Sequence, residues 1–225
     1  MPETVVRAVS LDRAYGVGDA QVRAVQDATF SVDAGDTVAL LGPSGSGKST
    51  LLHLIAGLDE PTAGSIEWPA LGGRWDLRPG PVGIAFQGPS LLPPLTVVEN
   101  VALPMVLAGA DEDDATAAAR DLLDVFEVDA IADRLPEELS GGQSERVGIA
   151  RAFSGSPRLV LADEPTGQQD RSTGGRLLEA IVTVAVLGGA ALIVATHDAA
   201  VAERLTARWA MRDGALRTQE LTCSS

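Results

Sequence analysis

Short apolar runs alternate along the chain with segments whose apolar residues recur at helical spacing. Asp36 to Leu41 is one such run, and Ser49 to Gly57 follows it with helical spacing and a closing glycine. Arg158 to Ala162 and Ala190 to Ala195 are further unbroken apolar runs of strand length. Such runs are typical of strands in a parallel sheet that is covered on both faces. The pattern therefore predicts an α/β fold.

The middle of the chain has a different pattern, which predicts a helical lobe. Ala110 to Glu127 opens with four acidic residues, Asp111 to Asp114, which favour a helix N-terminus. Ala, Leu and Val then recur at helical spacing through the rest of the segment. We expect these four acids to lie at a helix start or on a solvated face, and we expect the same solvated position for Asp59 and Glu60.

Two apolar stretches have to be tested as membrane spans. Val101 to Ala110 is too short and contains a proline, and Ala180 to Ala195 is interrupted by two adjacent glycines. Spanning takes about 20 apolar residues, so we interpret the second stretch as a helix end, a turn and a buried strand. Met1 to Ala8 lacks the apolar run of a secretory signal. We expect a protein that is soluble by itself.

Composition narrows the function classes. With 225 residues, 45% of them hydrophobic, the chain is long enough for one large domain or a core with an inserted lobe. The net charge of −14, without a dense basic cluster, argues against nucleic-acid binding and against direct docking on anionic lipid. The only cysteine, Cys223, excludes a disulfide framework and a thiolate metal cluster. A reducing, cytoplasmic location fits.

The chain's single lysine lies in a phosphate-binding loop. Of 17 basic residues only Lys48 is a lysine, so this position needs something that arginine cannot supply. Its surroundings match the template G-x-x-x-x-G-K-[ST], in which backbone N–H groups surround a phosphate and the lysine reaches the β- and γ-phosphates. A compact ammonium fits there, and a planar guanidinium is too wide. The loop consists of Gly42, Pro43, Ser44, Gly45, Ser46, Gly47, Lys48, Ser49 and Thr50.

Further motifs follow this loop in a fixed order. Leu139 to Gln143 reads LSGGQ, and Leu159 to Pro165 is an apolar run that ends in Asp-Glu-Pro. Gln87 follows Ala-Phe, and His197 lies in Ala-Thr-His-Asp. The set resembles the ATP-binding cassette (ABC) family over essentially the whole chain. In that family, LSGGQ is the signature, the run ending in Asp-Glu-Pro is the Walker B strand with its glutamate, Gln87 matches the Q-loop and His197 the switch histidine. Tyr15 falls where that family places an adenine-stacking aromatic.

The resemblance implies a P-loop NTPase (RecA-like) core with a mainly parallel sheet, an N-terminal antiparallel β subdomain and an inserted α-helical subdomain. Residues 1–225 would form a single ABC ATPase domain. Within it, 1–87 and 155–225 would be the nucleotide-binding core, and 88–154 the helical subdomain that carries the signature.

The resemblance also implies ATP and Mg²⁺ as ligands and hydrolysis to ADP and phosphate as the reaction. Lys48 would hold the β- and γ-phosphates, Ser49 would ligate Mg²⁺, and Thr50 would contact phosphate. Asp163 and Gln87 would bind the metal or its water, and Gln87 would also act in catalysis. Glu164 would orient or deprotonate the attacking water, and His197 would contact the γ-phosphate.

The signature implies a second subunit. Ser140 is placed to cap a helix that begins with Gly141 and Gly142, which predicts a second anion site. In the family this site faces the γ-phosphate held by another copy, so two subunits would enclose two ATP molecules. The cofactor-binding set therefore also includes Ser140, Gly141, Gly142, Gln143 and the D-loop residue Asp170.

The sequence departs from the family pattern in two segments, the D-loop and the residues after the signature. The D-loop usually reads Gly-x-Leu-Asp, but Gln169 stands here in place of leucine. After the signature, Ser144 and Glu145 replace the common Gln-Gln, which adds a negative charge near the signature helix. The catalytic set itself is complete.

Segments around the motifs resemble the macrolide-exporter, lipoprotein-release and cell-division branch of bacterial ABC ATPases. They are residues 55–64, 91–101 and 162–167. The resemblance implies a subunit, peripheral on the inner face of the cell membrane, that drives a separate permease, with a homodimer as the expected form. The permease would dock near Gln87 to Val106, where Leu91, Leu92 and Leu95 are expected to be exposed.

Two other functions stay open at this stage. One is a regulatory ATPase that controls a cell-wall hydrolase without transport. The other, a soluble ABC protein acting on ribosomes or DNA, is disfavoured by the single cassette and the acidic charge. The sequence does not indicate the transported substrate, the direction of transport or the identity of the permease. We expect Trp68, Trp75 and Trp209 to contribute to packing rather than to contact ligands.

Overall fold

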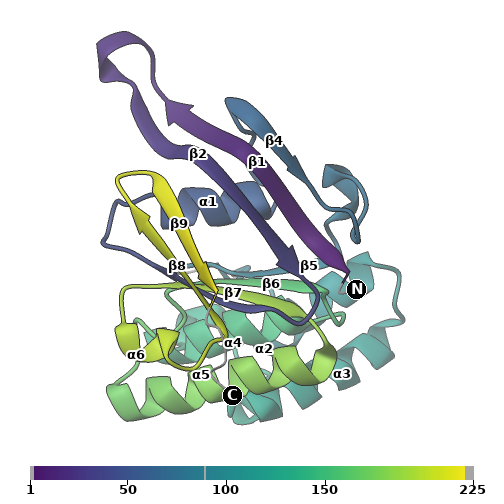
Figure 1. Ribbon diagram of the computed structural model, residues 1–225. Helices are drawn as coiled ribbons and strands as arrows, with labels where there is room; N and C mark the ends of the chain where they lie inside the picture. Colours follow the sequence, from purple (N-terminus) through teal and green to yellow (C-terminus); the bar gives the residue numbers. More distant parts are fainter. Residues whose placement is uncertain (1–2, 89, 221–225) are drawn as a thin grey trace, which may run out of the picture. The chain divides into compact units, whose positions relative to one another are not determined.

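The computed structural model describes residues 3–88 and 90–220 (Figure 1). The chain divides into two compact units, which we call the first and second units. The first is Met1–Leu77 with Ala191–Ser225, and the second is Arg78–Ala190. Cys223, expected to be an inert tail thiol, lies outside the described residues. No helix within the described ranges is long and apolar enough to cross a membrane.

Strands dominate the first unit, in the spatial order β4-β1-β2-β9-β8-β3-β7. The N-terminal strands β1 and β2 pair antiparallel along their length, and β4 joins the outer edge of β1 (Figure 1). β3 is parallel to both β7 and β8. The predicted antiparallel N-terminal part and parallel core are both confirmed. The bounds are β1 Thr4–Tyr15, β2 Val22–Asp33, β3 Thr37–Leu41, β4 Ala63–Glu67, β7 Ala191–Thr196, β8 Ala207–Arg212 and β9 Ala215–Glu220.

Helix α1, Lys48–Ile55, follows β3 as the apolar pattern predicts. Its leucines and Ile55 are buried, which anchors the helix in the first unit. The Trp68 indole N–H donates a 2.8 Å hydrogen bond to the carbonyl oxygen of Ile55. This bond satisfies one of the carbonyls that a helix end leaves without an intrahelical partner. The short helix α6, Ala199–Ala202, lies between β7 and β8 in the chain.

The tryptophans do not all pack as expected. Trp68 and Trp209 are buried, and the Trp209 ring lies 4.9 Å from that of Phe30, centroid to centroid. Trp75, by contrast, is 85% exposed, so the expectation was wrong there. It lies in a short surface 3₁₀-helix, Arg74–Asp76, where the next residue, Leu77, takes the buried position instead.

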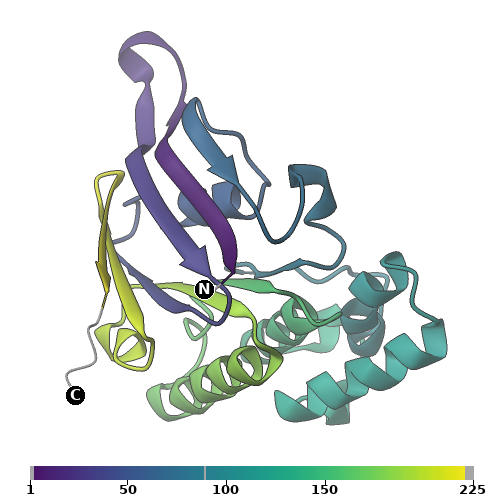
Figure 2. The same cartoon turned by 45° about the vertical axis from the view of Figure 1, so that its right-hand side comes forward.

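The second unit contains two parallel strands and most of the long helices. β5, Val82–Ala85, pairs in register with β6, Leu159–Asp163. Helices α2, α3 and α4 pack against one another as the teal to green group in Figure 2, with the rings of Phe126 and Phe153 5.7 Å apart. The helices are α2 Val97–Leu107, α3 Glu112–Val125, α4 Gly141–Phe153 and α5 Arg171–Gly188.

Local signals fix the helix ends in this unit. Asp111 caps α3 by accepting the backbone N–H groups of Asp113 and Asp114, which confirms the predicted helix start. At the other end of the unit, α5 stops at Gly189, which adopts a left-handed conformation with φ of 67°. The stretch that resembled a membrane span is therefore a helix end, a turn and strand β7, as predicted.

Candidate functional site: two sets of nucleotide-binding motifs

The phosphate loop joins β3 to α1 within the first unit. Gly47 occupies the N-cap position of α1 with φ of 105°, a conformation that side chains disfavour. A Cβ atom there would lie only 2.0 Å from the carbonyl oxygen of Ala24. Only glycine fits this position, and it lets the loop turn sharply into the helix.

Polar groups of the loop are arranged to receive an anion. The Lys48 ammonium, 7% exposed, donates to the carbonyl oxygens of Gly42 at 2.7 Å and Pro43 at 3.3 Å. Among the described residues, the buried hydroxyl of Ser46 has no hydrogen-bond partner, and no side chain caps the N-terminus of α1. The first N–H groups of α1 are therefore those that a phosphate would satisfy. The loop therefore fits a nucleotide phosphate.

Strand register brings His197 to the same edge as this loop. Leu41, the last residue of β3, is paired with Thr196, the last residue of β7. The phosphate loop begins directly after Leu41, and His197 follows Thr196 directly. His197 is exposed at this edge, where the carboxyl ends of parallel strands commonly bind ligands.

Tyr15 is held by two side chains of the first unit. Its hydroxyl donates a 2.7 Å hydrogen bond to Asp59, and the Arg13 guanidinium lies 4.5 Å from the ring centroid. Arg13 also pairs with Asp59 at 2.7 Å. Asp59 was expected on a solvated face, but it is half-buried and ties the end of β1 to the segment after α1.

The electrostatics of this cluster predict a pH-dependent stability. Burial alone would raise the pKa of Asp59, but hydrogen bonds from Tyr15 and the Glu60 backbone, with the Arg13 charge, outweigh it and lower that pKa below its ordinary 3.8. A lowered pKa in the folded state means that the carboxylate contributes stability above the ordinary value. That stability is lost as pH falls through the folded-state pKa.

We expect Asp59→Asn to destabilise the protein by about 1 kcal/mol near neutral pH. The difference from wild type should shrink as pH falls below 3.8, because the wild-type carboxyl then becomes protonated. Thermal unfolding of both proteins between neutral and acid pH checks this. Asp121→Asn, an exposed change on α3, controls for net charge. A difference that stays constant over the acid range would contradict the assignment.

In the second unit, strand register gathers another set of predicted residues. Ala85 at the end of β5 is paired with Ala162 of β6, so Gln87 and Asp163 leave the sheet at the same edge. Asp163 is buried and Gln87 is exposed. Glu164, the next residue, adopts φ of 50°, which is unusual for a residue with a side chain. Such backbone strain tends to occur at functional positions.

The signature forms the N-terminus of α4, as predicted. Ser140 is the N-cap, and its hydroxyl accepts the backbone N–H of Gln143. The Gln143 side chain in turn accepts the backbone N–H of Ser140 at 2.9 Å, which completes a capping box. Asp170 caps α5 by accepting the backbone N–H groups of Ser172 and Thr173. Hydrogen bonds from the Thr173 side chain and backbone, and from Ser172, lower the pKa of Asp170.

The predicted site residues thus fall into two sets, one in each unit. The first unit carries Tyr15, Gly42 to Thr50 and His197, and the second carries Gln87, Ser140 to Gln143, Asp163, Glu164 and Asp170. Strand register brings the phosphate loop and His197 to one edge in the first unit, and Gln87 and Asp163 to one edge in the second, where Gln169 of the D-loop also contacts Gly142.

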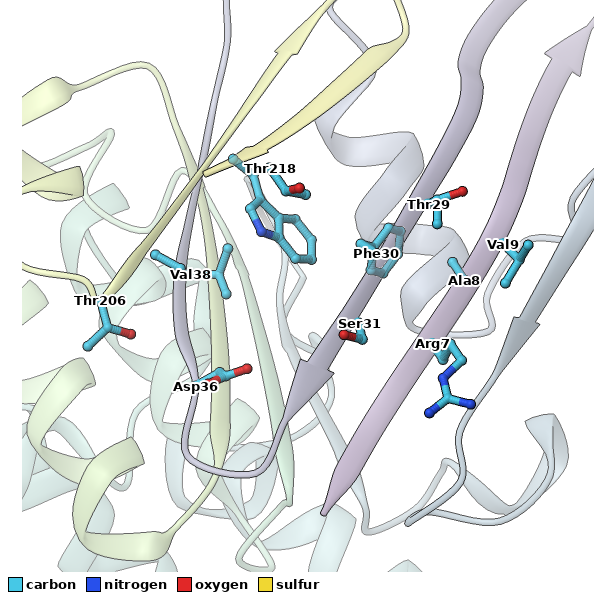
Figure 3. Close-up of a pocket in the computed structure, with 12 residues that line it drawn as sticks. Arg7, Ala8, Val9, Thr29, Phe30, Ser31, Asp36, Val38, Thr206 and Thr218 are labelled. Carbon is cyan, nitrogen blue, oxygen red and sulfur yellow. The ribbon is translucent and has the colours of Figure 1, made fainter. Parts of the chain in front are cut away.

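A separate hollow in the first unit contains none of these residues. It measures about 640 Å³ and lies between β1 and β2 on one side and β3, β8 and β9 on the other. Figure 3 shows Phe30 of β2 at this hollow, with Val38 and Thr218 to its left and Asp36 and Arg7 lower in the view. The nucleotide-binding motifs lie elsewhere in the unit.

Comparison with known proteins identifies the family. The ABC transporter family matches residues 25–167. The chain is also 36% identical to the lipoprotein-releasing system ATP-binding protein LolD of Legionella pneumophila (strain Paris), over 98% of this chain and 100% of that protein. The chain belongs to the ABC transporter family. As an ATP-binding subunit of this family it hydrolyses ATP to ADP and phosphate.

Solved ABC cassettes share the fold. The dimeric post-hydrolysis structure of the cassette MJ0796 bound to ADP and Pi has a TM-score of 0.88 and 32% identity, covering 96% of this chain and 98% of that one. The cassette cbiO1 of Clostridium perfringens, part of the complex cbiONQ, has a TM-score of 0.83 and 26% identity, covering 97% and 88%. The predicted P-loop NTPase class is confirmed.

One contact of this ABC subunit was not predicted. Glu145 and Gln169, the two departures from the family pattern, are hydrogen-bonded to each other. Sequence reasoning treated them as separate, because they lie in different motifs. The signal in the sequence was that each of these positions departs from the family pattern, and that an amide at 169 can donate a hydrogen bond to a carboxylate at 145.

Proposed function

We propose that this protein is the ATPase subunit of a lipoprotein-handling ABC transporter, that it works as a homodimer with Mg²⁺, and that it drives a separate membrane permease. The observation that carries the substrate class is the 36% identity to LolD, which extends over nearly the whole of both chains. The motif segments at 55–64, 91–101 and 162–167 support the same branch. The protein would lie on the inner face of the membrane, bound to its permease.

The phosphate loop would bind the nucleotide. Lys48 would exchange its bonds to the Gly42 and Pro43 carbonyls for the β- and γ-phosphate oxygens, a short movement for a flexible side chain. The first N–H groups of α1 would complete the cradle. Tyr15 would stack on the adenine while Asp59 and Arg13 hold its ring.

Oxygen-bearing side chains suited to Mg²⁺ are present at the expected positions. Ser49, Gln87 and Asp163 would hold the ion or its water shell. When bound, Mg²⁺ neutralises charge on the transferred phosphoryl group. Buried Asp163 follows an apolar strand, so its carboxylate is fixed with little freedom to reorient.

Glu164 would act as the general base. It would orient the attacking water and accept its proton, while Gln87 positions the same water and His197 donates a hydrogen bond to the γ-phosphate. The backbone at Glu164 is fixed because its carbonyl oxygen accepts the Gly167 N–H at 3.0 Å. A base held in this way has its carboxylate positioned before the substrate arrives.

Two copies would enclose two ATP molecules, each between the phosphate loop of one subunit and the signature of the other. Gly141 and Gly142 would supply N–H groups at the start of α4, where anions are favoured, while the capping box uses those of Ser140 and Gln143. The dimeric MJ0796 cassette bound to ADP and Pi supports this arrangement. We propose a division into a core, residues 1–87 and 155–225, and a helical subdomain, 88–154. The core would then bind the nucleotide, and the helical subdomain would carry the signature that contacts the partner's ATP.

The permease would dock on the loop before α2 and on the start of that helix, within Gln87 to Val106. Asn100, fully buried, shapes this loop: its amide donates to the carbonyl oxygens of Leu92, Leu95 and Thr96 at 3.0–3.1 Å. Leu92 is 42% exposed, as expected, whereas Leu91 and Leu95 are half-buried because the loop folds back onto α2. Within residues 90–96, the exposed positions are Leu92, Pro93 and Pro94.

A membrane copurification tests the proposed function. Glu164→Gln protein is cross-linked in native membranes with ATP and purified, and its partners are identified by mass spectrometry. We expect a multi-span permease with a large extracytoplasmic domain, and vesicles holding the complex should release lipoprotein upon ATP hydrolysis. Leu92→Asp should weaken the association without changing the fold. Recovery of soluble partners alone, or of a permease associated with a cell-wall hydrolase, would refute the proposal.

A further inference from the structure

The two departures from the family pattern are direct partners in the second unit. The Gln169 side-chain amide donates to the Glu145 carboxylate at 3.2 Å and to the carbonyl oxygen of Gly142 at 3.0 Å. The other Glu145 oxygen accepts the backbone N–H of Gln168 at 3.4 Å. A leucine at position 169 could make neither of the side-chain bonds. The D-loop is therefore bonded to the first turns of α4 by two residues that depart from the usual family pattern.

The fit between the loop and the helix is close. A Cβ atom at Gly141 would lie 1.9 Å from the side-chain oxygen of Gln168, and one at Gly142 would lie 2.7 Å from the side-chain nitrogen of Gln169. The two glutamines thus lie directly on the signature glycines. A pocket of about 360 Å³ opens beside them, and Ser140, Gln143 and Gln169 are among its lining residues.

The same loop begins at the proposed general base. We call residues 164–170, between β6 and α5, the 164–170 loop. It is fixed at its start by the bond between Gly167 N–H and the Glu164 carbonyl oxygen, and at its end by Asp170, which caps α5. Glu145 adds an attachment between these two points. A shift of the N-terminus of α4 is therefore transmitted to the segment that carries Glu164.

The Glu145 carboxylate depends on these donors. Burial raises the pKa of Glu145, and the Gln169 amide, the Gln168 and Gly167 N–H groups and the Arg146 charge act in the opposite direction. When a half-buried carboxylate loses a hydrogen-bond donor, the loss of its hydration is no longer offset, and the folded state is destabilised. The bond to Gln169 is thus the element whose removal should loosen the attachment most.

We propose that Glu145 and Gln169 are positioning residues that clamp the 164–170 loop to the signature helix, so that hydrolysis at one ATP depends on the ATP held at the other site. This inference rests on the proposed dimer. There, the signature helix of each subunit contacts the ATP of its partner, while Glu164 acts on the ATP of its own subunit. The clamp joins these two groups through one chain.

A double-mutant cycle tests the clamp. Gln169→Leu, Glu145→Gln and the double variant are compared with wild type by the ATP dependence of turnover. We expect Gln169→Leu to lower kcat about fivefold with little change in KM, and to move the Hill coefficient toward unity. The double variant should show little further loss beyond Gln169→Leu alone, because the bond between the two side chains is already absent in that background.

Gln21→Leu is the matched control, since it makes the same change at an exposed position of the first unit, outside the signature and the 164–170 loop. It should retain the wild-type Hill coefficient. The clamp proposal would be overturned if the two single variants lowered kcat by independent factors that multiply in the double variant. It would also be overturned if Gln169→Leu kept the wild-type Hill coefficient. If Gln169→Leu does not fold, Glu145→Gln, which keeps the shape of the side chain, carries the test through the same loss of cooperativity.

The ATP-dependent dimer of the Glu164→Gln variant, measured by light scattering, separates this inference from the proposed function. Absence of that dimer would defeat the proposed arrangement of two subunits. A normal dimer with additive Glu145 and Gln169 effects would defeat the clamp alone.

Discussion

Replacing Glu164 by glutamine is expected to lower ATP turnover by about 10²–10³-fold while ATP still binds. Glutamine has the shape of glutamate but cannot accept a proton from water. The left-handed backbone at this position, φ of 50°, should be kept because the two side chains branch alike and the carbonyl oxygen still accepts the Gly167 N–H. The loss would therefore report chemistry rather than folding.

Phosphate release under saturating ATP measures this turnover, and equilibrium binding of a fluorescent ATP analogue measures nucleotide affinity. Glu112→Gln, the same chemical change on exposed α3, should keep wild-type turnover. Turnover of Glu164→Gln within about threefold of wild type would be incompatible with a general base that contributes the usual 10²–10⁴-fold.

Replacing Gly83 by alanine is expected to destabilise the fold by about 3 kcal/mol or more. Gly83 lies in β5, where α4 crosses so closely that a Cβ atom would be 1.7 Å from the carbonyl oxygen of Ala152 and 2.7 Å from its carbonyl carbon. Neither is a flexible side chain, so the helix and the strand must separate. Because α4 carries the signature and β5 leads to Gln87, activity should fall as well.

Thermal unfolding checks this, with an expected decrease in Tm of roughly 6–12 °C for a chain of this size. Gly188→Ala is the matched control: it adds the same methyl group at the end of α5, where nothing lies within 4 Å of the added atom. We expect it to be neutral or slightly stabilising, by up to about 1 kcal/mol. Equal Tm values for the two variants would show that β5 and α4 accommodate the methyl group.

Much of the fold was predictable because its signals are local. The apolar run before the phosphate loop, the cap at Asp111 and the glycine that ends α5 each specify an element through neighbouring residues. Ser140 capped α4 as predicted for the same reason. Strand register then placed His197 beside the loop and Gln87 beside Asp163 without further information from the sequence.

Contacts between distant segments could not be predicted in this way. Asp59 is 44 residues from Tyr15, and nothing in its local sequence distinguishes it from a solvated acid. Trp75 is exposed because the turn of a short helix gives the interior position to Leu77. The contact between Glu145 and Gln169 likewise depends on how the loop after β6 meets α4. Tertiary packing decided each case.

Buried Asn100 helps to set the shape of the loop before α2, whereas the exposed side chains of the loop set its surface chemistry. The hydrogen bonds that bend the chain between Leu92 and Thr96 come from the Asn100 side chain on α2, and Pro93 and Pro94 restrict the backbone between them. The exposed Leu92 side chain contributes little to this shape, so substitutions there can accumulate at little cost to the loop. If the proposed permease docks on this loop, gene duplication followed by drift at Leu92 would let one ATPase scaffold acquire new membrane partners while its catalytic machinery stays unchanged.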